Sequence, residues 1–126
     1  MAKRIVVVNH TWDMLELYDV LLSPEGYEVI PEKFNTHALP DIARYSPDLV
    51  ILDYVFGIEE YTWKTLRKLR TDHLTASTPI IICTTANRFI LEMDEFLSQA
   101  NVSVLSKPFD VADLLDTIEQ VLASKN

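Results

Sequence analysis

The sequence predicts an α/β fold, in which a doubly wound, five-stranded parallel sheet carries helices on both faces. Five short apolar runs, rich in β-branched side chains, are spread along the 126 residues, and segments with helical periodicity lie between them. Runs of about four such residues are typical of buried strands. Buried strands that alternate with amphipathic helices are in turn typical of parallel sheets. The predicted strands are Ile5–Val8, Tyr27–Ile30, Leu49–Leu52, Ile80–Cys83 and Val102–Leu105.

The helices are predicted from apolar side chains that recur at helical spacing. Pro24 and Gly26 stop the first helix, and Asp110 is the expected N-cap of the last. The predicted helices cover Met14–Leu22, His37–Tyr45, the residues around Trp63–Leu69, Phe89–Leu97 and Val111–Leu122. Because right-handed crossovers leave few topologies for five such units, we expect the flavodoxin-like strand order 2-1-3-4-5. In that order a crevice lies beyond the carboxyl ends of the first and third strands.

Composition excludes several classes of function. Eleven Lys and Arg against nineteen Asp and Glu give a net charge of −8, which disfavours non-specific binding to nucleic acid or to anionic membranes. The two glycines, Gly26 and Gly57, cannot form a phosphate-binding loop or a dinucleotide fingerprint. The single cysteine, Cys83, excludes a disulfide framework within the chain. The N-terminal apolar run is too short for a signal peptide, so we expect one cytoplasmic domain over residues 1–126.

Polar residues follow the predicted strands at the edge where the crevice is expected. Asp53 follows the third strand, Thr84 the fourth and Lys107-Pro108 the fifth. A carboxylate nucleophile, a hydroxyl donor and an ammonium group suit phosphoryl chemistry. The spacing alone also permits a simpler interpretation, in which an Asp–Lys pair holds the strand ends together.

Four stretches resemble the response-regulator receiver domains of bacterial two-component signalling. They are RIVVVNHTWDMLELYDVLLSPEGYEV, SPDLVILDYVF, TPIIICTTA and VSVLSKPFDVADLL, and the resemblance runs from Lys3 to about Ala123. It implies that Asp53 accepts a phosphoryl group from a sensor histidine kinase or a phosphotransfer protein, that Thr84 moves to bind this group, and that Lys107 contacts it. It also implies a downstream protein partner or a homodimer on the helices Arg88–Gln99 and Val111–Val121.

The sequence departs from the family at the metal site. Receivers normally end the first strand with two acidic residues that help to hold Mg²⁺, but Asn9 and His10 stand there. The remaining ligands would be Asp53, the backbone carbonyl of Val55 and, through water, Asn9. Because Mg²⁺ prefers hard oxygen ligands over imidazole, we expect weak binding.

His10 and Val104 leave alternatives open. His10 is interpreted as a hydrogen-bonded loop residue, as a ligand in a borderline site for Zn²⁺, Ni²⁺ or Mn²⁺, or as an imidazolium that pairs with Asp53. Val104 stands three positions before Lys107, where the family usually has an aromatic residue. The favoured hypothesis is a receiver that uses Asp53 and is no enzyme beyond its own phosphoryl transfer. The alternative is a pseudo-receiver, a non-phosphorylated protein-interaction module.

Overall fold

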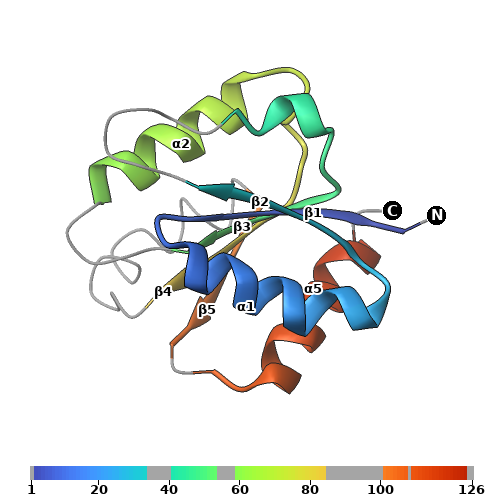
Figure 1. The fold of residues 1–126 in the computed structure, drawn as a ribbon. Helices are drawn as coiled ribbons and strands as arrows, with labels where there is room; N and C mark the ends of the chain where they lie inside the picture. The colour runs from blue at the N-terminus through green and yellow to red at the C-terminus, as the bar shows by residue number, and fades with distance from the viewer. Residues whose placement is uncertain (1, 34–40, 54–58, 85–100, 108, 125–126) are drawn as a thin grey trace.

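A computed structural model describes residues 2–33, 41–53, 59–84, 101–107 and 109–124 of the chain. Within these ranges a five-stranded parallel sheet has the order β2-β1-β3-β4-β5, which confirms the predicted fold and strand order (Figure 1). The strands are β1 (Arg4–Asn9), β2 (Glu28–Lys33), β3 (Leu49–Asp53), β4 (Ile80–Thr84) and β5 (Val102–Ser106). Each predicted strand is therefore present, and its ends lie within one residue of those predicted, except that β2 continues three residues further, to Lys33.

Three α-helices and two short 3₁₀ helices are described. They are α1 (Trp12–Leu22), η1 (Ser23–Glu25), η2 (Ala43–Tyr45), α2 (Glu59–Thr71) and α5 (Val111–Ser124). The predicted helix Phe89–Leu97 and residues 37–40 of the predicted helix His37–Tyr45 lie outside the described residues. The prediction of an α-helix is wrong for residues 41–45, where only η2 forms. Ser46 has a φ of 48°, in the left-handed region, and its N–H donates to the carbonyl of Ala43 at 3.1 Å, which closes the single turn.

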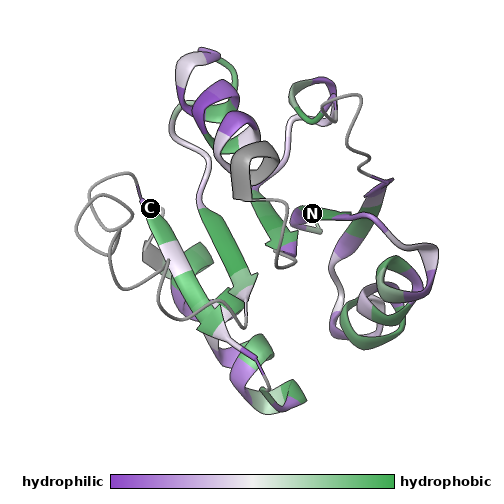
Figure 2. Cartoon of the chain, turned by 90° about the vertical axis from the view of Figure 1, so that its left-hand side faces the viewer, coloured by the Kyte–Doolittle hydropathy of each residue, from purple (hydrophilic) through white to green (hydrophobic). Residues whose placement is uncertain are grey.

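The strand side chains alternate between two core clusters, one on each face of the sheet. Val6 and Val8 of β1 pack toward α2, whereas Ile5 and Val7 pack toward α1 and α5. Figure 1 shows α1 and α5 on one side of the sheet and α2 on the other. In Figure 2 the central strands are largely hydrophobic, and the helices carry both kinds of residue. The two-sided burial is what β-branched runs in a parallel sheet predict.

The helix ends are fixed by local hydrogen bonds. Thr11 caps α1, because its hydroxyl accepts a bond from the backbone N–H of Met14 at 3.4 Å. Gly26, with a φ of 92°, follows η1 and stops the chain from continuing as a helix, as the sequence predicts. Asp110 accepts a bond from the N–H of Asp113 at 2.9 Å, which confirms it as the N-cap of α5. Val111, the first residue of α5, is exposed, whereas Leu114 and Ile118 of the same helix are buried.

No helix within the described ranges is long and apolar enough to cross a membrane. The longest of them, α5, has 14 residues, well short of the roughly 20 that a spanning helix needs.

Helix α1 offers a matched pair of leucines that tests its buried face. Leu15 is 1% exposed and Leu17 is 46% exposed. We expect Leu15→Ala to lower the free energy of unfolding by about 2–5 kcal/mol, because it removes buried methyl groups and leaves a cavity. Leu17→Ala, with the same chemistry on the outer face, should change it by less than about 0.5 kcal/mol. Urea titrations followed by circular dichroism measure both, and equal losses would contradict this orientation of α1.

Cys83 is fully buried in the cluster under α1 and α5, and its environment suppresses its reactivity. Burial raises the pKa of its thiol to about 11, with a further contribution from the charge of Asp53. We expect iodoacetamide at pH 8 to label the native protein at least about 100-fold more slowly than the urea-unfolded chain, because the thiolate is the reactive form. Intact mass spectrometry over time gives both rates. Comparable rates would show that the thiol is accessible in the folded protein.

Candidate functional site

The candidate site lies at the carboxyl end of β3, in the middle of the sheet. Asp53 is the last residue of this strand and follows Leu49 and Ile51 in the alternation, so its side chain lies on the face covered by α1 and α5. Its register partner on β4 is Cys83. The carboxylate is completely shielded from solvent. A carboxylate without water must be paired with a charge or with hydrogen-bond donors, and the described side chains supply both.

Lys107 pairs with one oxygen of this carboxylate. Its ammonium group forms a salt bridge and a hydrogen bond with Oδ1 of Asp53. The Lys107 side chain is 23% exposed, so the pair reaches from the sheet end toward the surface. The backbone N–H of Lys107 donates to the carbonyl of Thr84 at 2.8 Å, which extends the pairing of β4 and β5 by one residue. The structure thus brings Asp53 and Lys107 together.

The second oxygen of Asp53 has a partner that the sequence analysis missed. The hydroxyl of Tyr18, in the middle of α1, donates to Oδ2 at 3.2 Å. Tyr18 is 2% exposed. Burial, followed by the neighbouring Cys83 side chain and the charge of Asp53, raises the pKa of this hydroxyl far above its ordinary value. The hydroxyl therefore remains protonated and can serve as a donor. A tyrosine within an otherwise apolar stripe was the available signal, because a buried hydroxyl needs a partner.

At the end of β1, Asn9 and His10 have different surroundings. Asn9 is buried, and its Oδ1 accepts hydrogen bonds from the N–H and the hydroxyl of Thr11, at 2.8 and 3.0 Å. This oxygen therefore holds the start of α1. His10 is exposed. No group of three His, Cys, Asp or Glu side chains that could hold a metal exists among the described residues. The carboxylate that the described residues supply here is that of Asp53, and Mg²⁺ in proteins is usually held by one or two carboxylates together with several waters.

The remaining predicted site residues lie around this centre. Thr84 is fully buried at the end of β4. Val104 is half-buried and packs against the cluster under α2, on the sheet face opposite Tyr18. Val55 and Pro108 lie outside the described residues. Thr84 is therefore joined to the site by its backbone contact with Lys107.

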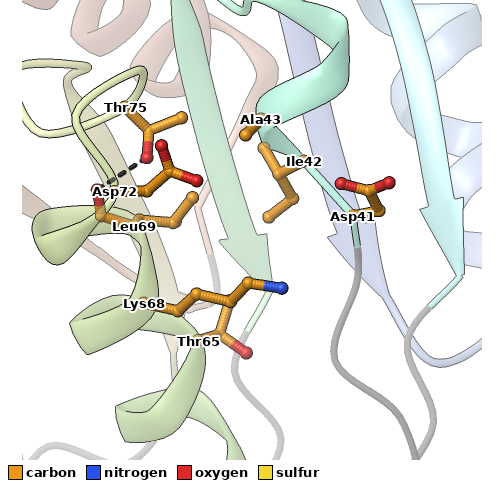
Figure 3. Close-up of a pocket in the computed structure, with 8 residues that line it drawn as sticks. All are labelled: Asp41, Ile42, Ala43, Thr65, Lys68, Leu69, Asp72 and Thr75. Atoms are coloured by element: carbon orange, nitrogen blue, oxygen red, sulfur yellow. Dashed lines mark hydrogen bonds between the residues drawn. The ribbon is translucent and has the colours of Figure 1, made fainter.

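A hollow of about 140 Å³ lies elsewhere, between α2 and the segment around η2 (Figure 3). The Thr75 hydroxyl at its edge donates to the carbonyl of Leu69 at 2.6 Å, so it closes the end of α2. Neither Asp53 nor Lys107 lines this hollow. Its lining residues are Asp41, Ile42, Ala43, Thr65, Lys68, Leu69, Asp72 and Thr75.

Comparisons with known proteins agree with the fold. The chain is 29% identical to the phosphate regulon transcriptional regulatory protein PhoB of Pseudomonas aeruginosa over 128 residues, which cover 96% of this chain and 52% of PhoB. It thus spans about half the length of that relative. It is 29% identical to protein PilH of the same organism, and the match covers 98% of this chain and 99% of PilH. Chemotaxis response regulator CheY4 of Vibrio cholerae has the same fold, with a TM-score of 0.76 at 22% identity over 96% of this chain and 99% of CheY4.

The family itself is established over most of the chain. The model of the response regulator receiver domain matches residues 5–119. This range begins in β1 and ends within α5, so it includes nearly the whole sheet and the pair of Asp53 with Lys107. The chain therefore belongs to the response regulator receiver domain family of two-component signalling.

Proposed function

We propose that Asp53 is the phosphoacceptor of this receiver domain and that Lys107 stabilises the phosphoryl group. The observation that carries the proposal is the ion pair of these two residues at the carboxyl end of the central strand β3. A parallel α/β sheet of this order places its reactive groups at this edge. No described feature of the chain favours the pseudo-receiver alternative over this function.

The proposed reaction is a transfer of one phosphoryl group to a carboxylate oxygen. A carboxylate oxygen of Asp53 forms a bond to phosphorus, the phosphorus–nitrogen bond of a phosphohistidine breaks, and the imidazole leaves with the electron pair. Negative charge on the phosphoryl oxygens is then offset by the ammonium of Lys107, which acts as a point charge. The hydroxyl of Thr84 is proposed to bind one of these oxygens, since β4 ends beside β3.

The partners follow from the family. Receiver domains are in general signalling domains rather than enzymes, and they interact with histidine kinases or phosphotransfer proteins and with downstream effectors. For this chain we propose a sensor histidine kinase or a phosphotransfer protein as phosphodonor and a protein partner as output, with α5 (Val111–Ser124) as part of the contact surface. A homodimer on the same surface and a cytoplasmic location remain predictions.

Phosphorylation by a small donor tests the role of Asp53. We expect incubation with acetyl phosphate to add the mass of one phosphoryl group, and we expect Asp53→Asn to abolish the addition because the amide is not a nucleophile. Asp48→Asn is the matched control, since Asp48 lies just before the amino end of the same strand and accepts a bond from the Arg4 N–H at 2.8 Å. Intact mass spectrometry and peptide mapping measure the site. No addition from acetyl phosphate or from a histidine phosphodonor would refute the proposal.

Restoring the acidic pair tests the analysis of the metal ligands. We expect the double variant Asn9→Asp, His10→Asp to bind Mg²⁺ at least about tenfold more tightly than the natural chain, because it adds two carboxylates beside Asp53. A carboxylate in place of the Asn9 amide can still accept bonds from Thr11, so α1 keeps its start. Isothermal titration calorimetry measures the affinity. If the affinity does not rise, the end of β1 does not line the site.

A further inference from the structure

Tyr18 is a polar residue on a face of α1 that otherwise packs apolar side chains. Its neighbours in the cluster beneath the sheet include Leu15 and Leu22 of the same helix, and Leu114 and Ile118 of α5. Its ring is packed among them, and its hydroxyl lies 3.2 Å from Oδ2 of Asp53. A phenylalanine would fill the same space. The hydroxyl is therefore not required for packing, and what it adds is one hydrogen bond to a buried anion.

The two donors bond different oxygens of the Asp53 carboxylate and differ in exposure. Lys107 comes from the segment after β5 and is partly exposed, whereas Tyr18 comes from the core side and is almost fully buried. Lys107 can move with a phosphoryl group at the surface, since its stem is long and flexible. Tyr18 is fixed by the packing of its ring. A group at the surface that draws Oδ2 away from the core, or takes the lone pair that Tyr18 uses, therefore displaces the Tyr18 contact.

The neighbouring thiol interacts with the Tyr18 hydroxyl, but it is a weaker acceptor than the carboxylate. Cys83 is the register partner of Asp53 and interacts with the Tyr18 side chain. Because burial raises the pKa of the thiol to about 11, Cys83 is neutral near pH 7 and is a weak acceptor. The carboxylate is a far stronger acceptor than a thiol. The Tyr18 hydroxyl accordingly stays directed at Asp53.

We propose that Tyr18 is a positioning residue that holds Asp53 turned toward the core and so restrains the carboxylate from binding a phosphoryl group or a divalent cation. This inference deepens the proposed function, because it assigns the regulation of the same aspartate. Hydrogen bonds to charged groups are the strong ones, and loss of one changes an equilibrium by about tenfold or more. Removal of the hydroxyl should therefore raise the affinity of the carboxylate for a phosphoryl group or a cation by about tenfold.

The test compares Tyr18→Phe with Tyr27→Phe. Tyr27 is half-buried against the same core cluster, and its hydroxyl is not hydrogen-bonded to Asp53, so it controls for the loss of a tyrosine hydroxyl. Both substitutions are made in the Asn9→Asp, His10→Asp background and titrated with Mg²⁺. They are also made in the natural chain, which is treated with acetyl phosphate. Circular dichroism and thermal unfolding establish that each variant is folded.

We expect Tyr18→Phe to tighten Mg²⁺ binding about tenfold and to speed phosphorylation of Asp53 by a similar factor, with Tyr27→Phe near the parent in both. The Mg²⁺ titration decides the inference. If a folded Tyr18→Phe variant binds Mg²⁺ no more tightly than its parent, the inference is overturned. The Tyr18 hydroxyl then has no effect on binding by Asp53 or favours it. If Tyr18→Phe tightens Mg²⁺ binding but no donor phosphorylates either the natural chain or its Tyr18→Phe variant, the restraint by Tyr18 stands and the proposed function fails.

Discussion

The structure of the site depends on one constraint, that a carboxylate without access to water must be fully paired. The Asp53 side chain is completely shielded, and its two oxygens are bonded to Lys107 and Tyr18. These three residues come from β3, from the segment after β5 and from α1, so the fold must bring distant parts of the chain together before the charge is satisfied. Removal of either partner would leave a buried lone pair without a donor, which is costly.

The replacement of the usual acidic pair changes the charge balance at this place. Asn9 is neutral and its oxygen is used to hold Thr11, so the charged groups of the described site are Asp53 and Lys107, whose charges cancel. The chain as a whole carries −8. The pair of Asp53 and Lys107 therefore adds nothing to this net charge, which favours solubility and can contribute to the choice of partner.

Local patterns explain why the sheet was predictable and why parts of the site were not. The strands are runs of β-branched residues, and the ends of parallel strands converge, so Asp53 and Lys107 could be placed together from sequence. Helical periodicity predicts only that Tyr18 lies on the buried face of the first helix, and it does not show where the hydroxyl points. The α-helix predicted over residues 41–45 failed because a turn closed by Ser46 depends on backbone conformation that composition does not specify.

The aromatic side chain that bonds to Asp53 comes from helix α1. Val104 stands three positions before Lys107, where receivers usually have an aromatic side chain, and it packs on the α2 face of the sheet. Tyr18, which bonds to Asp53, packs on the opposite face, the one covered by α1 and α5. Asn9 also reaches α1, through its bonds to the capping residue Thr11. Helix α1 is thus tied to the carboxyl ends of β1 and β3, at its first turn and at its middle. In the described part of the chain, a change in the position of the Asp53 side chain would accordingly be transmitted to α1 through its direct contact with Tyr18. Val104 has no aromatic ring that could respond to the same change.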